Sequence, residues 1–369
     1  MNLTDSDRKE KLAELINLSL IPGIGPTRIY QLVSIFDSIS SILGASESTL
    51  ASLPGFGAEI SRRIRNGQNR LNARKITDEI EKLGWRYYLY DDSDYPAPLK
   101  EVPDRPPYLF YLGEYRDTDN LAIAIVGSRS TSEEGRLFAE NLACTLAENG
   151  VTVISGMARG TDISAHRGAL NGGGRTIAVF GCSLEIVYPP EGRELAKKIV
   201  DNGAIFSEYL PGTVPYGPNF PKRNRIISGL SQGVVIIEAA ERSGALSTAG
   251  HALSQNREVF AVPGSPRLET SKGTNRLIKE GAKLLTSVED IFSELPRLKG
   301  EVKAQQARLA AELTETERKV IQLFASGPVH LDALSRQMNM PVTELMPILL
   351  ALELKGLIRE LAGKRYILS

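Results

Sequence analysis

Short segments that combine glycine, hydroxyl and cationic residues follow several apolar stretches between residues 120 and 295. Gly127-Ser128-Arg129 follows the first such stretch, and Gly156 and Arg159 follow the second. Glycine lets a ligand approach the backbone closely, and helix N-termini and guanidinium groups donate hydrogen bonds to phosphate. The pattern therefore predicts a binding site for several phosphates. The candidate binding residues are Gly127, Ser128, Arg129, Gly156, Arg159, Phe220, Lys222, Arg223, Asn224, Arg225, Ser243, Gly244 and Thr248.

Arg129 and Arg223 are the cations that we expect to contact phosphate most directly. A guanidinium group can grip two phosphate oxygens at once, whereas Lys222 is a flexible point charge. We therefore expect Arg223→Ala to weaken binding more than Lys222→Ala, with thermal stability unchanged. The alternative is an internal ion pair between Arg223 and a carboxylate such as Glu238, in which case the variant would melt earlier.

Three further side chains have two roles open to them. Arg225 could contact phosphate or form an internal ion pair with Glu208 or Glu238. Phe220 could stack on a base or anchor its proline-rich loop. His166 is expected to be a structural hydrogen-bond partner rather than a catalyst.

The elements that position these segments alternate between strand and helix. Short, continuous apolar strands separated by helices predict a parallel sheet that is covered on both faces. Ligands of such sheets bind at the carboxyl ends of the strands, where the glycine-containing segments lie. The predicted strands are 121–126, 151–154, 176–180, 204–207, 234–237, 258–262 and 283–286.

A helical domain is predicted over 1–75. It contains two copies of an apolar-Pro-Gly-x-Gly turn, at 20–26 and 52–58, each followed by a helical pattern. This helix-hairpin-helix (SAM-like) pattern exposes N–H groups that could contact DNA phosphates, or it could serve in a protein-interaction module. The segment that follows, 76–120, contains two aromatic-rich strands, which favour core packing over base stacking.

A winged helix is predicted over 313–369, after a linker at 296–312. Its third helix, starting near Pro341, should be the recognition helix, yet it is poor in basic residues and carries Glu344. That composition favours a protein-contact or structural role over reading of duplex DNA. The expected fold is therefore an α/β, extended Rossmann-like parallel sheet core in 76–295, flanked by the helical and winged-helix domains.

Composition excludes several classes of protein. The 369 residues contain 44 Lys and Arg and 44 Asp and Glu, so the protein does not coat duplex DNA through a general positive charge. Two cysteines and three dispersed histidines offer no zinc site or disulfide framework. The Rossmann G-x-G-x-x-G and the P-loop motif are both missing. With no long apolar run, we expect a soluble, cytoplasmic protein that does not insert into membranes.

The middle region resembles the DprA/Smf family, DNA-processing protein A. The resemblance covers the whole region, and both flanking regions are similar to domains of longer family members. The residues that carry it are Gly127-Ser128-Arg129, Ser155-Gly156-x-Ala158-Arg159-Gly160-x-Asp162-x-x-Ala165-His166, Thr176-Ile177-Ala178-Val179, Tyr188-Pro189, Ser207-Glu208, Phe220-Pro221-x-Arg223-Asn224-Arg225-Ile226-Ile227-Ser228-Gly229-Leu230-Ser231, Ser243-Gly244-Ala245-Leu246-x-Thr248-Ala249 and Val259-Phe260-Ala261-Val262-Pro263-Gly264.

That resemblance implies a bacterial protein that binds and protects single-stranded DNA during natural transformation. It also implies a recombination mediator that loads a RecA-type recombinase past single-strand-binding protein, with a homodimer as the working unit. The candidate residues above would then be the single-stranded DNA site.

The family's core domain is similar to the cytokinin-activating phosphoribohydrolases, which carry a catalytic glutamate in a P-G-G-x-G-T-x-x-E loop. Here the corresponding position is Gly250 or His251, and neither can act as a carboxylate base. We therefore expect a non-enzymatic protein with no catalytic residue, cofactor or metal. Two alternatives stay open: a hydrolase acting on a nucleoside phosphate, and a transcription regulator that reads duplex DNA through the winged helix.

Overall fold

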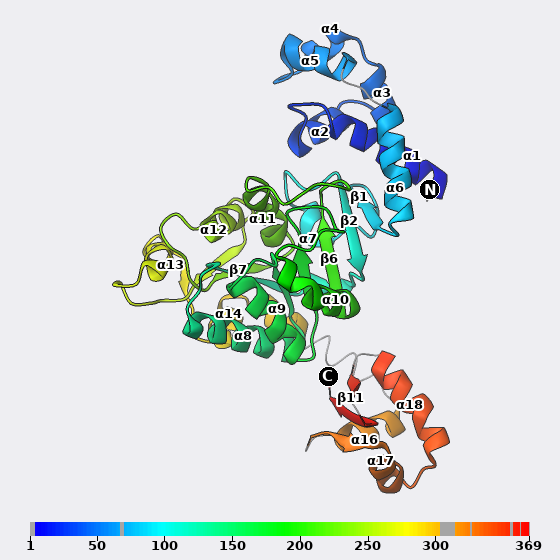
Figure 1. The fold of residues 1–369 in the computed structure, drawn as a ribbon, viewed down its shortest axis with the longest axis vertical. Coiled ribbons are helices and arrows are strands. Elements are labelled where there is room, and N and C mark those ends of the chain that lie inside the picture. The colour runs from blue at the N-terminus through cyan, green and yellow to red at the C-terminus, as the bar shows by residue number, and fades with distance from the viewer. Residues whose placement is uncertain are drawn as a thin grey trace.

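The two helix-hairpin-helix repeats form a helical domain at one end of the molecule (Figure 1). The computed structural model describes residues 4–66, 70–302, 314–324, 327–354, 357–361 and 363–368. Both Pro-Gly turns lead into helices as predicted, and Phe56 is fully buried in the domain core. The helices are α1 (Asp5–Ser19), α2 (Pro26–Val33), α3 (Ile39–Gly44), α4 (Glu47–Ala51), α5 (Gly57–Asn66) and α6 (Arg70–Lys82).

Helix α6 runs past residue 75, which was the predicted end of the helical domain. It packs against α1 and buries Ile80 in the same apolar cluster as Leu15 of α1. The helical unit therefore extends to Lys82, because α6 packs along its length against α1.

The middle region forms a nine-stranded sheet with the order β1-β2-β6-β5-β4-β3-β7-β8-β9. From β6 to β9 every neighbouring pair is parallel, as the alternating pattern predicted. The aromatic strands of 76–120 extend this sheet, since β2 pairs antiparallel with β6 and β1 with β2. The strands are β1 (Arg86–Leu89), β2 (Tyr108–Gly113), β3 (Ala122–Val126), β4 (Thr152–Ser155), β5 (Thr176–Val179), β6 (Gly203–Ser207), β7 (Gly233–Ile236), β8 (Glu258–Ala261) and β9 (Lys283–Leu284).

Helices cover both faces of the sheet (Figure 1). In β3, Ile123 and Ile125 face α8, α9 and α14, while Ala122 and Ala124 share a core with α11 and α12. Every residue of β3 is buried, which explains why this strand is continuously apolar rather than alternating. The helices are α7 (Ala97–Lys100), α8 (Glu133–Glu148), α9 (Thr161–Asn171), α10 (Arg193–Asn202), α11 (Asn219–Gly229), α12 (Ala245–Ser254), α13 (Glu269–Lys279) and α14 (Val288–Glu294), with short 3₁₀ turns η1 (Asp117–Asn120) and η2 (Pro190–Gly192).

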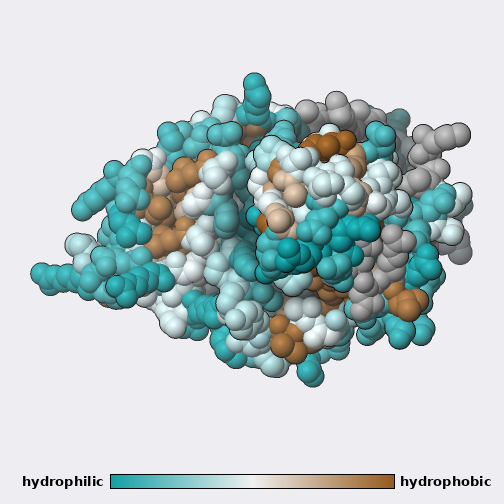
Figure 2. Space-filling model, turned by 90° about the horizontal axis from the view of Figure 1, so that it is seen from above, coloured by the Kyte–Doolittle hydropathy of each residue, from teal (hydrophilic) through white to brown (hydrophobic). Residues whose placement is uncertain are grey.

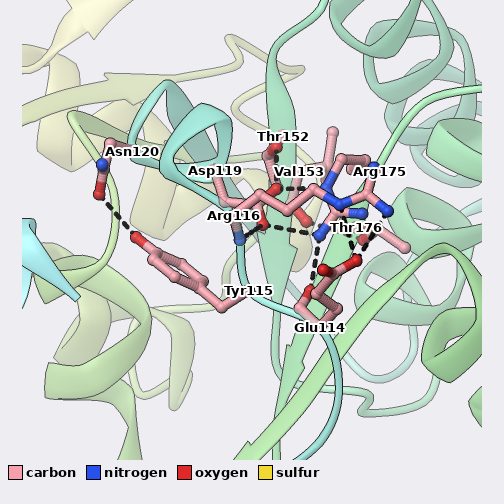
Figure 3. Close-up of polar contacts among 9 residues, drawn as sticks. All are labelled: Glu114, Tyr115, Arg116, Asp119, Asn120, Thr152, Val153, Arg175 and Thr176. Carbon is pink, nitrogen blue, oxygen red and sulfur yellow. Dashed lines mark hydrogen bonds and ion pairs between the residues drawn. The ribbon is translucent and has the colours of Figure 1, made fainter. Parts of the chain in front are cut away.

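A buried ion pair lies at the amino ends of the parallel strands, where β4 and β5 begin (Figure 3). The carboxylate of Asp119 is fully buried and accepts hydrogen bonds from Arg175 Nε and Nη2, both at 2.7 Å. Thr152 Oγ1 and the backbone N–H of Arg116 donate to the same carboxylate at 2.8 Å. Because four donors converge on this group, it ties the η1 turn to both strands.

We expect Asp119→Asn to destabilise the fold by about 1.5–3 kcal/mol, because the amide loses the charge and turns a donor toward Arg175 or Arg116. Urea unfolding followed by circular dichroism measures the change. The control is Glu194→Gln, which removes the exposed pair with Lys197 and should leave the midpoint unchanged. Equal midpoints for the two variants would contradict the prediction.

The C-terminal residues form the predicted winged helix, drawn as a separate unit in Figure 1. Its core contains Val320, Phe324, Leu334, Leu349 and Tyr366. The predicted two-stranded wing is confirmed by the antiparallel pairing of β11 with β12, and β10 adds a third strand to the sheet by pairing with β12. The elements are α16 (Glu315–Gln322), β10 (Val329–His330), α17 (Leu331–Met338), α18 (Val342–Leu354), β11 (Ile358–Leu361) and β12 (Arg365–Leu368).

Two kinds of feature are absent from the described residues. Among them there is no helix with the length and apolar character needed to cross a membrane. The same residues contain no group of three or more His, Cys, Asp or Glu side chains arranged to hold a metal ion.

Candidate nucleic-acid interface

Three of the predicted residues meet where α11 begins, at the carboxyl edge of the sheet. The ring of half-buried Phe220 lies between two guanidinium groups, with Arg129 Cζ 5.2 Å and Arg223 Cζ 5.9 Å from its centre. The ring also rests on Gly181, where a Cβ atom would come within 2.8 Å of it. Phe220 therefore anchors its loop and also supports exposed Arg129, whereas its stacking on a base stays a prediction.

Arg223 does not reach solvent, contrary to the expectation that it contacts phosphate directly. Its residue exposure is only 3%, and Nη1 donates to the carbonyl oxygens of Gly156, at 2.9 Å, and Val179. Arg223 forms no ion pair with a described carboxylate, and the opposite charge that acts on it most strongly is that of Asp162, not Glu238. Burial lowers the pKa of Arg223, and the nearby Asp162 opposes this shift. The guanidinium therefore joins the ends of β4 and β5 inside the protein.

Asp162 and His166 complete the buried polar group beneath this edge. Asp162 accepts hydrogen bonds from the N–H groups of Gly156 at 3.2 Å and Ala158 at 3.1 Å. Burial raises the pKa of Asp162 to about 6, against the opposing charge of Arg223. Burial also lowers the pKa of His166 to about 3, so the imidazole is neutral, with Nδ1 2.7 Å from Thr176 Oγ1. His166 thus has the expected structural role, whereas the electrostatic effect of Asp162 on Arg223 was not predicted.

Arg225 forms one of the internal ion pairs left open by the sequence. Its Nη2 donates to Glu208 Oε2, and its Nε lies 3.3 Å from Asp104 Oδ2. The opposite charges raise the pKa of Arg225 against the lowering effect of burial. With 6% exposure and two carboxylate partners, Arg225 is not available to bind a strand across the outer surface.

Glu238 occupies the position where many α/β folds bind a phosphate. It follows β7 at the point where the strand order changes direction, and its Oε2 accepts from Thr131 Oγ1 at 2.7 Å and the Ser132 N–H at 2.9 Å. Gly135 in the first turn of α8 leaves room for this carboxylate. A negative side chain at a helix N-terminus stabilises the helix and repels a second anion. The usual dinucleotide site is therefore filled by the protein itself.

The remaining cations differ in whether they have a partner. Exposed Arg159 forms an ion pair with Glu191, with Nη2 3.2 Å from Oε2. Arg129 and Lys222 are both exposed, and neither has a carboxylate partner in the part of the chain that the structure describes. Of the five cations predicted, these two are the ones positioned to attract a polyanion.

The predicted glycines serve mainly to pack the protein against itself. A Cβ at Gly127 would lie 2.4 Å from Thr161 Oγ1, and a Cβ at Gly156 would lie 2.5 Å from Arg223 Nη2. By contrast, a Cβ at Gly244 would have no atom within 4 Å, so this backbone is open to a ligand. The close approach inferred from sequence therefore applies to neighbouring protein atoms at the first two positions.

Polar residues near Gly244 form a hydrogen-bonded turn. Asn224 Nδ2 donates to Ser247 Oγ at 2.9 Å and to the Gly244 carbonyl at 3.3 Å. Ser243 Oγ accepts from the Ala245 N–H at 3.3 Å, whereas Thr248 is buried, with no hydrogen-bond partner for its hydroxyl in the described structure. Near Arg129, Ser128 Oγ accepts from the Ser130 N–H at 3.1 Å. These residues shape the two loops, and Ser128 and Ser243 remain partly accessible.

Known families match all three parts of the chain. Residues 86–296 match DNA recombination-mediator protein A, 304–364 the DprA winged helix domain, and 13–67 the SAM-like helix-hairpin-helix tandem. Protein Smf of Synechocystis is 32% identical over 94% of this chain and 96% of its own length. The chain belongs to the DNA recombination-mediator protein A family. The DNA processing protein DprA of Streptococcus pneumoniae is 43% identical over 59% of this chain and 77% of its own.

Solved structures of two family members support the fold. The X-ray structure of Streptococcus pneumoniae DprA matches with a TM-score of 0.62 at 34% identity, covering 80% of this chain and 99% of that one. A structure described as showing the single-stranded DNA binding mode of Helicobacter pylori DNA processing protein A matches with a TM-score of 0.52 at 31% identity, covering 58% and 96%. Both matches agree with the Rossmann-like core, and the domain matches agree with the predicted flanking folds.

Proposed function

We propose that this protein binds single-stranded DNA through the carboxyl edge of its sheet. The observation that carries the proposal is the exposed guanidinium of Arg129, which rests on the Phe220 ring without a carboxylate partner in the described structure. Unpaired cations beside an aromatic ring bind a flexible strand by its phosphates and bases. The single-stranded DNA binding named for the Helicobacter pylori relative supports this assignment.

We further propose that the bound strand is protected and passed to a RecA-type recombinase during natural transformation. Loading past single-strand-binding protein, a homodimeric working unit and a cytoplasmic location belong to this proposal and are supported by family membership. The proposed binding residues are Arg129 and Lys222, with Phe220, Ser128, Ser243 and Gly244 around them.

A binding role fits this edge better than hydrolysis of a nucleoside phosphate. The two glutamates that follow strands are already engaged, Glu208 with Arg225 and Glu238 with the N-terminus of α8. A general base must be free to take a proton from water or substrate, and neither carboxylate is placed to do so. Turnover measurements on nucleoside monophosphates test this part of the proposal.

The winged helix favours protein contact over reading of duplex DNA. Helix α18, which would enter the major groove, exposes apolar Met346 and Leu350, at 43% and 56%. Glu344 lies in its first turn, where it would face phosphate. A recognition helix needs cations and hydrogen-bond donors toward the groove, and these three residues supply neither.

The salt dependence of binding tests how many cations act. For Z neutralised phosphates on a single strand, log K falls with log[salt] by about 0.7Z. From the sequence, Arg129, Lys222, Arg223 and Arg225 together would give a slope of roughly −2 to −3 per protomer. In the described structure only Arg129 and Lys222 of these four are exposed and without a carboxylate partner, so we expect about −1.4. Titration of fluorescent oligo-dT at several salt concentrations measures it.

The comparison with matched duplex completes this experiment. A single strand should bind more tightly than the duplex, because its unpaired bases can stack on Phe220 while its phosphates contact Arg129. In a duplex the bases are paired and stacked, so they cannot reach the Phe220 ring. A slope near zero, or tighter binding of duplex than of oligo-dT, would overturn the proposed function.

A further inference from the structure

Tyr216 is the only exposed aromatic side chain among the residues that the structure describes, with 61% of its surface accessible. It lies in the loop that joins β6 to α11, at the carboxyl edge of the sheet. The surface seen from the helical-domain end is largely hydrophilic (Figure 2). Single exposed apolar side chains are common on protein surfaces, so the surroundings of this ring decide whether it has a role.

Tyr216 also differs from the other tyrosines of the chain. The sequence has twelve tyrosines, and in the described structure all the others have a ring contact, a cation contact or a side-chain hydrogen bond. The side chain of Tyr216 has none of these interactions within the described residues. Its ring is therefore free to pack against a group from outside the chain.

Hydrogen bonds hold the loop on both sides of Tyr216. Before it, the carbonyl oxygen of Thr213 accepts from the Ser183 N–H at 3.0 Å. After it, the carbonyl oxygen of Tyr216 accepts from the Asn219 N–H at 2.9 Å. Pro215 directly precedes Tyr216 and restricts the backbone further. An ordered loop thus presents the ring, so little conformational entropy would be lost when a ligand packs on it.

The ring lies beside residues proposed to bind the strand. Phe220 follows Tyr216 by four residues, and its N–H donates to the Gly217 carbonyl at 3.3 Å, so one compact turn carries both rings. A Cβ at Gly217 would meet no atom within 4 Å, which leaves the backbone between the two rings open to a ligand. Exposed Lys222 follows on α11. Two rings and a cation suit a ligand with flat groups joined by phosphates.

We propose that Tyr216 stacks on an unpaired base of the single strand whose phosphates contact Arg129 and Lys222. Every base has an aromatic face, so this contact adds affinity without selecting a sequence. The tyrosine ring neutralises no phosphate, so its contribution does not depend on salt, unlike that of the two cations. The inference rests on the proposed function and adds a base contact outside the candidate residues predicted from the sequence.

Tyr216→Ala should weaken binding of oligo-dT about tenfold, within the range for the loss of one stacked base. The salt slope should stay at about −1.4, because both free cations remain. Tyr216→Phe should bind like wild type, since it keeps the ring. The matched control is Val214→Ala, because Val214 lies in the same loop and is 64% exposed but has no aromatic face. Anisotropy titrations of the full chain at several salt concentrations measure these affinities.

A strand of abasic sites with the same length separates stacking from other effects. It keeps the phosphates and lacks the bases, so wild type and Tyr216→Ala should bind it equally. Tyr216→Trp gives a second readout, because Trp85, the chain's one tryptophan, is only 6% exposed. Oligo-dT should quench the fluorescence of the added indole, and the abasic strand should leave it unchanged.

The outcomes separate this inference from the proposed function. Equal affinity of wild type and Tyr216→Ala for oligo-dT would overturn the stacking role and leave the proposed function standing. A loss that persists with the abasic strand, or that Val214→Ala reproduces, would overturn it as well. Failure of wild type to bind oligo-dT would overturn the proposed function itself.

Discussion

Arg223→Ala is expected to destabilise the sheet domain by about 3–5 kcal/mol, the range found when a buried charge loses the opposite charge that compensates it. The guanidinium is buried, and Nη1 bonds to the carbonyl groups of Gly156 and Val179 at the ends of β4 and β5. Its loss would leave Asp162 as a buried carboxylate without a cation, together with two carbonyl oxygens that lose a donor. This effect replaces the selective loss of DNA affinity expected from the sequence.

Lys222→Ala is the matched control, because Lys222 is the neighbouring cation on α11 and is exposed. We expect the control to unfold at the wild-type urea concentration, and Arg223→Ala to unfold well below it. Adding Asp162→Asn to Arg223→Ala should recover part of the lost stability, since it removes the unpaired charge. Wild-type stability for Arg223→Ala, or a further loss in the double variant, would contradict the buried role.

The burial of Arg223 could not be read from local sequence. Arginine is rarely buried unless paired, so an arginine that starts a helix beside Lys222 is expected to face solvent. Its position depends on Gly156, which leaves room for the guanidinium, and on Asp162, and both reach it only when β4 and α11 come together. The spacing of Gly156 and Asp162 in one motif hinted at this, but spacing alone does not identify the partner.

The fold was more predictable than the site, because the signals that specify it are local. Continuous apolar strands such as β3 predict burial on both faces, and the aromatic run Tyr108–Gly113 matches strand β2. The antiparallel pairing of β2 with β6 joins segments distant in sequence, and no periodicity encodes strand order. Long-range contacts also explain why the sequence did not decide between phosphate contact and an internal ion pair for Arg225. Its second partner, Asp104, lies in a loop more than 100 residues earlier in the chain.

The position of Arg129, which has no carboxylate partner in the described structure, could be predicted from the local sequence. Arg129 follows β3 directly, so its place at the carboxyl edge is fixed by the strand itself. Arg159 also lies at this edge, but Glu191 pairs with it. The two arginines are thus alike in sequence context and differ in the ion pair, which makes them a natural pair for comparison.

Arg129→Ala is expected to weaken binding of oligo-dT about ten- to a hundredfold, because one charge-assisted contact is worth roughly 1.5–3 kcal/mol. The melting temperature should stay at the wild-type value, since Arg129 is exposed and its ring contact with Phe220 is the interaction lost. Arg159→Ala should lower affinity only a few-fold, because Glu191 already neutralises that guanidinium. Anisotropy titrations with melting curves alongside measure both properties. Equal losses for the two variants would show that charge at this edge, rather than the free guanidinium on Phe220, determines binding.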